Sequence, residues 1–226
     1  MTSSTSDTIV IDDAGGGNIV GGIVIGAIRG ETFASRVIGP EWFVLGPGVQ
    51  ALIAASVVEL VRELGDAHHI QLCRSDLFNQ AAHFLTRLGS YFIERGSFDG
   101  PIQDRTERAF YEHLVELGLP RHVMNMFPRE GEDKGRSYRA LNDFCTRYLM
   151  ADFPHRRRLA KENCRSFKKI EETPVERSFR HHVDGPRRRR CLECNRTVTE
   201  NAYHLKCGTQ NFYIHKECAP WTHKAH

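Results

Sequence analysis

The apolar residues at the start of the chain come in three short runs separated by turn-forming residues. The first run covers residues 8–11, the second covers 19–28 and the third covers 31–39. Glycines interrupt the second run, as in a buried strand that another backbone approaches closely. Arg29-Gly30 is typical of a hairpin turn before the third run. The pattern therefore predicts three consecutive antiparallel strands.

Beyond residue 40 most apolar residues take helical spacing, and Gly65 and Gly118 act as stop signals. Short apolar runs between these stretches predict further strands. The expected helices are residues 48–64, 76–88, 104–117 and 137–151, and the expected strands are 69–73 and 122–127. Hairpins followed by alternating helices and strands predict an α/β protein with a mixed sheet flanked by helices.

Size and composition fit a globular protein with one medium domain and a small appendage. The chain has 226 residues, of which 40% are hydrophobic and 26% charged. No apolar run is long enough to cross a bilayer, and the polar start is unlike a secretory signal. Cys73, Cys145 and Cys164 are widely scattered, which argues against a disulfide framework. We therefore expect an intracellular protein, cytoplasmic or nuclear, with no membrane partner.

The net charge of +3 hides an uneven distribution. Residues 1–154 hold 14 Lys and Arg against 20 Asp and Glu, a balance of −6, whereas residues 155–190 hold 13 against 5, a balance of +8. A basic stretch beside an acidic domain is common in proteins that act on nucleic acid. A solvated linker helix is the alternative interpretation.

Asp12 and Asp13 end the first expected strand, directly before the glycine-rich turn 14–18. Ligands collect at the carboxyl ends of strands in α/β sheets. Two adjacent carboxylates repel each other unless a cation compensates them, and Mg²⁺ or Mn²⁺ prefers carboxylate oxygens. The pair therefore predicts a divalent metal site, and an ordinary capped turn is the alternative.

The stretch Ile-Asp-Asp-Ala-Gly-Gly-Gly-Asn-Ile-Val-Gly at residues 11–21 resembles the opening motif of type II ribonuclease H enzymes. In that family an apolar residue precedes Asp-Glu-Ala-Gly-Arg-Gly, so Asp13 stands where the family has Glu, and Gly16 where it has Arg. The resemblance implies a ribonuclease H-like domain over residues 1–170. It also implies that three or four carboxylates bind two divalent metals for phosphodiester cleavage or strand transfer.

The resemblance implies further carboxylates after the fourth strand and on the helix after the fifth. Asp76 follows the expected strand 69–73, and a helix N-cap is its alternative role. Asp143 on the helix 137–151, or Asp133 before it, could close the site. A solvated helix face explains either residue equally well.

Basic side chains recur at helical spacing between residues 156 and 169 and continue across an expected linker, 171–190. Such a stripe could follow a phosphate backbone, with strongly salt-dependent binding. A nuclear-localisation signal would have the same composition. The candidate nucleic-acid-binding residues are Arg156, Arg157, Arg158, Lys161, Arg165, Lys168, Arg187, Arg188, Arg189 and Arg190.

The last 36 residues, 191–226, contain four pairs of metal ligands, each with two residues between the partners. Within them the segment Tyr203 to Ala219 resembles treble-clef-like zinc modules of the C1 and PHD/RING group. On that pattern Cys191, Cys194, His215 and Cys218 form one zinc site. His204, Cys207, His223 and His226 form a second, interleaved site, or Cys207 completes a single site. Ligand sets made only of protein groups favour structural zinc.

The sequence as a whole favours a Mg²⁺- or Mn²⁺-dependent nuclease or strand-transfer enzyme acting on nucleic acid, with a zinc module that positions the substrate. The alternative is a non-catalytic adaptor that binds nucleic acid or protein. It would keep the ribonuclease H-like scaffold and use the zinc module for a protein partner.

Overall fold

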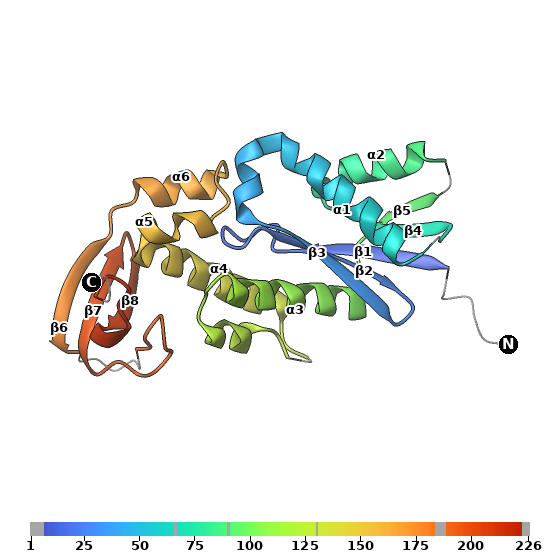
Figure 1. The fold of residues 1–226 in the computed structure, drawn as a ribbon. Helices are drawn as coiled ribbons and strands as arrows, with labels where there is room; N and C mark the ends of the chain where they lie inside the picture. Colours follow the sequence, from blue (N-terminus) through green and yellow to red (C-terminus); the bar gives the residue numbers. More distant parts are fainter. Residues whose placement is uncertain (1–6, 66, 90, 130, 184–188, 223–226) are drawn as a thin grey trace.

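A computed structural model describes residues 7–222 except 66, 90, 130 and 184–188. Its larger part is a five-stranded mixed sheet with helices on both faces (Figure 1). The strands lie in the order β3-β2-β1-β4-β5. Their bounds are β1 Thr8–Ala14, β2 Ile23–Arg29, β3 Thr32–Ile38, β4 His69–Cys73 and β5 Phe92–Gly96.

The first three strands form the antiparallel meander that the hydrophobic pattern predicts. β1 pairs with β2, and β2 pairs with β3 through a tight turn in which Gly30 has a φ of 57°. β4 and β5 then add to the other side of β1 in parallel. The strand ends of β1 and β4 consequently lie side by side at one edge of the sheet.

Helices cover both faces of this sheet (Figure 1). On one face α1 (Val49–Glu63) and α2 (Asn79–Arg87) bury their apolar sides against Ile9, Ile11 and Ile25. On the other face α3 (Pro101–Glu116) crosses β1 and β2, and α4 (Lys134–Ala151) follows it in the same hydrophobic core. The α/β class with a helix-flanked mixed sheet is thus confirmed.

One predicted strand is not formed, and one strand of the larger sheet was not predicted. Residues 122–127 form not a strand but part of the short 3₁₀ helix η3 (Arg121–Met126), whose turns are closed by Val123 N–H to Pro120 C=O and Phe127 N–H to Met124 C=O. β5 was missed because it is an edge strand. Its apolar run stops at Ile93 and is followed by Glu94-Arg95-Gly96, so the sequence lacks the longer apolar run of a strand buried on both faces.

The basic segment is not one helix, which corrects the predicted stripe. It consists of α5 (Phe153–Arg156), the 3₁₀ turn η4 (Arg157–Leu159) and α6 (Arg165–Glu172). Asn163, with a φ of 66°, bends the chain before α6. Residues 158, 161 and 165 therefore do not share a helix face.

The C-terminal segment forms a second, three-stranded sheet of β6 (Glu176–His182), β7 (Glu200–Cys207) and β8 (Gln210–His215), followed by the 3₁₀ turn η5 (Lys216–Cys218). β6 lies within the segment expected to be a linker and pairs antiparallel with β7. Leu205, Phe212 and Ile214 share one hydrophobic cluster with Phe144 and Leu149 of α4. The small sheet is therefore built onto the larger domain.

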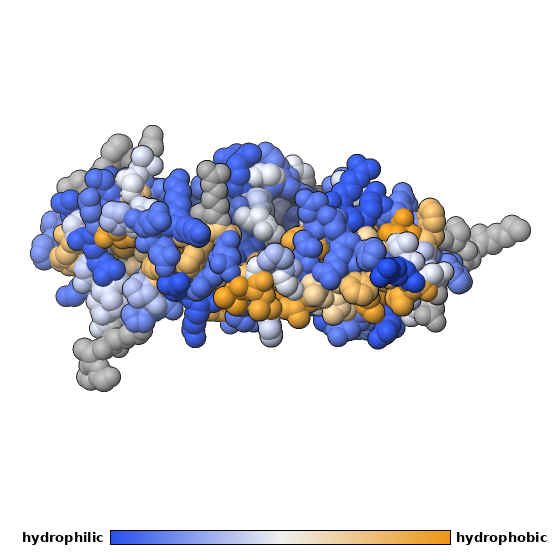
Figure 2. Space-filling model, turned by 90° about the horizontal axis from the view of Figure 1, so that it is seen from above, coloured by the Kyte–Doolittle hydropathy of each residue, from blue (hydrophilic) through white to orange (hydrophobic). Residues whose placement is uncertain are grey.

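One helical stretch of the described residues, 40–63, is long and apolar enough by length and composition to cross a membrane. It is η1 (Pro40–Gly48) joined to α1, and a kink at Gly46 interrupts it. Ile53, Val57 and Leu60 of α1 are buried in the sheet core. Figure 2, seen from the side of α1 and α2, shows apolar side chains gathered in a band along part of this face, with polar side chains around them. Trp42 and Val44 of η1 and Phe84 of α2 are among the exposed large apolar residues.

Candidate metal centres

Asp12, Asp13 and Cys73 converge where β1 and β4 end. Ile11 lies opposite Leu72 in the parallel pairing, so the next residues, Asp12 and Cys73, are neighbours across the strands. One ligand atom from each of the three side chains lies within 4.8 Å of the other two. Parallel pairing thus brings together groups that are far apart in the chain and that could hold a metal ion.

Burial makes this cluster electrostatically unfavourable without a cation. Asp12 is only 6% exposed, and burial raises its pKa despite a hydrogen bond from the Cys73 thiol. Burial, followed by the charge of Asp12, raises the pKa of Asp13 to about 6, although Lys161 opposes the shift. Burial also raises the pKa of Cys73 to about 11. A divalent ion would relieve the repulsion between the two carboxylates.

Asp13 opens into a cavity of about 460 Å³ between the end of the sheet, α3 and α4. The cavity combines acidic groups with aromatic and aliphatic walls and one lysine. Its lining comprises Asp13, Ala14, Gly15, Gly16, Gly17, Ser75, Asp76, Leu77, Glu107, Phe110, Tyr111, Pro128, Lys134, Tyr138 and Leu141. The volume lies within the range of small-molecule sites.

Glu107 is a candidate ligand that the sequence reasoning missed. It projects from α3 into the cavity, and its pKa is raised by burial and by the charges of Asp104 and Asp12, while Lys134 lowers it. The expected helix 104–117 included Glu107, but no motif marks it. Its one signal is its place a turn before Phe110 and Tyr111, on the side of the helix that the core requires.

The glycine turn is shaped by protein side chains. A Cβ at Gly15 would lie 2.3 Å from the Phe110 ring, and a Cβ at Gly17 would lie 2.2 Å from the Tyr138 hydroxyl. A Cβ at Gly16 would lie 2.9 Å from an Asp13 carboxylate oxygen. These glycines are needed because α3, α4 and Asp13 pack directly against the turn.

Lys161 is buried beneath this turn and stabilises it through hydrogen bonds. The sequence predicted instead that Lys161 contacts the phosphates of nucleic acid at the surface. It is 3% exposed, and its Nζ donates to the carbonyls of Gly15 (2.6 Å), Gly16 (3.0 Å) and Gly22 (3.3 Å). Its backbone N–H also bonds to Ile19 C=O. Burial lowers the pKa of Lys161 to about 8, while Cys164 and Asp13 oppose the shift.

The other predicted carboxylates lie in different places. Asp76 lines the cavity with Asp13, and its carboxylate accepts a 3.3 Å hydrogen bond from Asn79. Asp133 is exposed and caps the N-terminus of α4 by accepting from Arg136 N–H. Asp143 is exposed on α4 and does not line the cavity. Only Asp76 of the three shares the cavity with Asp13.

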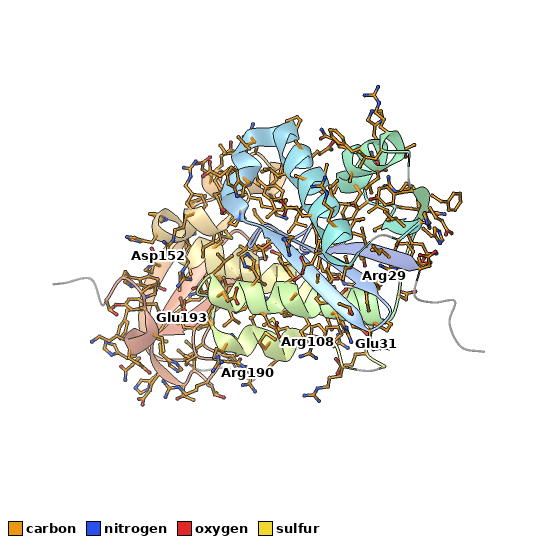
Figure 3. All side chains as sticks on the ribbon, turned by 45° about the vertical axis from the view of Figure 1, so that its right-hand side comes forward. Arg29, Glu31, Arg108, Asp152, Arg190 and Glu193 are labelled. Carbon is orange, nitrogen blue, oxygen red and sulfur yellow. The ribbon has the colours of Figure 1, made fainter. Side chains whose placement is uncertain are left out.

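The basic residues that were predicted to bind nucleic acid lie in different environments. Arg156 is buried: it donates to Tyr148 C=O and pairs with Glu193 at 2.7 Å, so it is a structural link between α5 and the C-terminal segment. Figure 3 shows Glu193 on that side of the molecule, near Asp152. Arg157 pairs with Glu162 and Glu171.

The remaining basic candidates are near the surface or outside the described structure. Arg158, Lys168 and Arg190 are exposed, and Arg189 lies over the Tyr213 ring. Arg165 begins α6. Arg187 and Arg188 lie outside the described residues.

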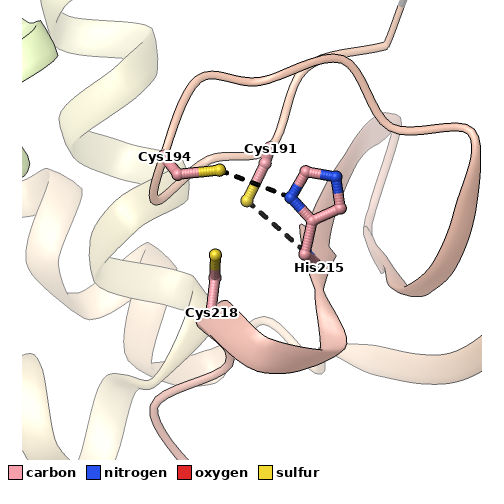
Figure 4. Close-up of side chains that lie close together, drawn as sticks. All are labelled: Cys191, Cys194, His215 and Cys218. Atoms are coloured by element: carbon pink, nitrogen blue, oxygen red, sulfur yellow. Dashed lines mark hydrogen bonds between the residues drawn. The ribbon is translucent and has the colours of Figure 1, made fainter.

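Cys191, Cys194, His215 and Cys218 form the second cluster of ligand side chains (Figure 4). Their ligand atoms all lie within 4.8 Å of one another, and Cys194 Sγ is 3.3 Å from His215 Nδ1. The two cysteines of the turn before β7 meet the end of β8 and η5 across the sheet. This is the first predicted zinc site, and the cluster could hold a zinc ion.

The surroundings favour the thiolate form of Cys194 and a fixed orientation of the His215 imidazole. Burial raises the pKa of Cys194, but hydrogen bonds from Arg196 outweigh it and bring the pKa to about 6. His215 Nε2 lies 3.2 Å from Thr197 C=O. Donation from Nε2 to that carbonyl would leave Nδ1 free to bind metal, an orientation that metal-ligating histidines commonly take.

The second predicted zinc site is not assembled within the described residues. His204 Nε2 lies 2.9 Å from Asn211 Oδ1, and the ring stacks on Tyr213. Cys207 is buried at the end of β7 and is absent from the four-ligand cluster. Both residues lie on a strand, where a spacing of three places side chains on opposite faces. His223 and His226 lie outside the described residues.

Comparisons with known proteins are weak. No family model matches the chain, and no curated protein matches it. One solved structure that it matches is described as "CryoEM structure of simian T-cell lymphotropic virus intasome in complex with PP2A regulatory subunit B56 gamma". The sequence identity is 7% and the TM-score 0.28, over 94% of this chain and 77% of that chain. A likeness at this TM-score carries no argument about fold or function.

Proposed function

We propose that the protein is a ribonuclease H-like, metal-dependent enzyme that cleaves or transfers phosphodiester bonds of nucleic acid. The observation that carries the proposal is the convergence of Asp12 and Asp13 at a strand end, beside a cavity that also receives Glu107. Three antiparallel strands extended by two parallel ones also support it, because the opening motif implies such a sheet.

Asp12, Asp13 and Glu107 are the proposed ligands for Mg²⁺ or Mn²⁺. A bound divalent ion would activate water and stabilise the leaving oxygen. Asp76 lies at the cavity rim, where it could hold a metal-bound water. Lys134, which pairs with Asp104 at 2.8 Å, adds a positive charge that would attract phosphate.

The four-ligand cluster is proposed to bind structural zinc in a treble-clef-like module that positions substrate. Its four protein ligands leave no coordination position open in a tetrahedral site. The Arg156–Glu193 pair joins the turn between Cys191 and Cys194 to the main domain. The exposed arginines Arg158 and Arg190 remain the proposed contacts to nucleic acid, and we keep an intracellular location as part of the proposal.

The test is cleavage of single-stranded and duplex DNA, RNA and hybrid by the zinc-loaded protein in Mg²⁺ or Mn²⁺. We expect Asp12→Asn to lower the rate on the order of a hundredfold or more, because the metal contributes several kcal/mol to the transition state. Asp143→Asn is the matched control, since this exposed carboxylate lies on α4 outside the cavity. Equal activity of Asp12→Asn and wild type would contradict the site.

A non-catalytic adaptor is the second candidate. Cys73 favours it, because a protonated thiol stands beside Asp12 where another carboxylate would suit Mg²⁺ better. In that case no cleavage occurs, and a protein or nucleic-acid partner binds equally to wild type and Asp12→Asn. Binding would then be lost in Cys191→Ser, which removes a zinc ligand.

A further inference from the structure

We propose that the cavity beneath α4 receives one unstacked nucleotide, with its base against Tyr138 and its phosphate toward Asp13 and Glu107. This rests on the proposed function and narrows the substrate to a single strand or a frayed end. The first reason is access, because Asp12 is 6% exposed and Asp13 sits at the cavity wall. A phosphate must enter the cavity to reach Asp13, which is the member of the pair that lines it.

α4 is the element that restricts entry. Lys134, Tyr138 and Leu141 follow one another at helical spacing, and all three line the cavity opposite Asp13. A regular duplex keeps its bases stacked inside and offers only its outer phosphates, so it meets α4 before it meets the carboxylates. A nucleotide turned out of the stack can enter alone, at a cost of a few kcal/mol of lost stacking.

The cavity walls suit a flat aromatic ligand. Tyr138 is 39% exposed although it lines a cavity, and Leu77 lies on the sheet side. Phe110 and Tyr111 are buried, and the Tyr111 hydroxyl is already used by Met126 C=O. Tyr138 packs closely against the glycine turn, since a Cβ at Gly17 would lie 2.2 Å from its hydroxyl oxygen. Exposed, fixed aromatic rings are the usual platforms for unstacked bases.

The size and the charge of the cavity also favour a single nucleotide that binds together with a cation. About 460 Å³ accommodates a mononucleotide but not a segment of duplex. The cavity holds three carboxylates, Asp13, Asp76 and Glu107, against Lys134. A phosphate would be repelled by this excess of negative charge unless a divalent cation is bound. Nucleotide binding should therefore require the cation.

The experiment is calorimetric titration of zinc-loaded, full-length protein with adenosine monophosphate, with and without Mn²⁺. We expect binding only with Mn²⁺. Tyr138→Ala should weaken it on the order of tenfold or more, because stacking on an aromatic ring contributes at this level. Tyr138→Phe should retain binding. Phe92→Ala is the matched control, as Phe92 is 69% exposed on β5, outside the cavity.

Thermal unfolding and zinc content of Tyr138→Ala show whether the variant is folded. Mononucleotide binding that needs no cation, or that is unchanged in folded Tyr138→Ala, would overturn the inference. If Tyr138→Ala does not fold, Tyr138→Phe provides the test. Loss of nucleotide binding in Tyr138→Phe would overturn the inference, because that variant keeps the aromatic ring.

A cleavage assay separates this inference from the proposed function. Identical sequences are compared as single strands and as closed duplexes without free ends. Faster cleavage of the single strand, reduced in Tyr138→Ala, supports both. Equal rates on the two, unchanged in Tyr138→Ala, overturn the nucleotide pocket and leave the nuclease standing. Mn²⁺-dependent mononucleotide binding with no cleavage of any substrate supports the pocket and refutes the nuclease.

Discussion

The two ligand clusters of this protein are assembled in opposite ways. The Cys191–Cys218 cluster comes from 28 consecutive residues, in which a turn, a hairpin and a 3₁₀ turn present four closed ligands. The Asp12 cluster joins the ends of two parallel strands that are far apart in the chain, and its Asp13 lines a cavity. Local assembly therefore suits a structural ion, whereas long-range assembly leaves space for a substrate.

The largest effect should come from breaking the local cluster. We expect Cys191→Ser to lose zinc and to unfold the β6–β8 sheet, because metal binding supplies about 10 kcal/mol or more of folding free energy in small zinc modules. Since Leu205 and Ile214 share a core with α4, the whole protein should melt at lower temperature. Zinc content and thermal unfolding measure this.

The control for that experiment is His204→Ala, which changes a histidine of the same sequence pattern that lies outside the cluster. It should keep its zinc content within error. A full loss of zinc in His204→Ala would show instead that the second ligand set takes part.

A smaller effect should follow from removing the internal support of the Asp12 cluster. Lys161→Met leaves the carbonyls of Gly15, Gly16 and Gly22 without their buried donor. We expect a loss of about 3 kcal/mol in the free energy of unfolding, from unsatisfied buried groups and from the uncompensated charge of Asp13. Urea denaturation measures it.

Lys168→Met is the matched control, because Lys168 is exposed on α6. A change within about 0.5 kcal/mol is expected there. If the two variants were equally stable, Lys161 would not support the turn as its hydrogen bonds indicate.

An effect of similar size is a pH dependence confined to the carboxylate cluster. The pKa of Asp13 is raised in the folded state from 3.8 to about 6, by burial and then by Asp12. Between these values the folded protein holds more protons than the unfolded chain, so its stability falls as pH rises. For zinc-loaded protein without Mg²⁺ or Mn²⁺, we expect Asp13 to contribute a fall of about 3 kcal/mol.

Urea denaturation across this pH window, compared between wild type and Asp13→Asn, isolates the contribution. The amide that replaces the carboxylate does not titrate, so the variant should lack this fall. Added Mn²⁺ should also reduce the fall in wild type by stabilising the ionised carboxylates. An identical pH slope in wild type and variant would show that folding does not raise the pKa of Asp13.

Much of the larger sheet follows from periodicity. The β1–β3 meander and helices α1, α3 and α4 were predicted because strong apolar patterns of period 2 or 3.6 and glycine stop signals mark them. β5 and β6 were not predicted, since both are exposed edge strands. The basic stripe failed because side-chain spacing predicts a shared face only where the chain is one helix, and Asn163 breaks it.

The sequence by itself determined the Asp12-Asp13 pair after a strand, and a four-ligand cluster whose spacing needs only a turn and a hairpin. Only the tertiary structure placed Cys73 and Glu107 near Asp12, buried Lys161 under the glycine turn, and excluded His204 and Cys207 from the cluster. The physical reason is that ligand spacing encodes contacts within one turn of chain. Contacts between strands, and between a helix and a sheet, depend on pairing and packing of segments that no local pattern specifies.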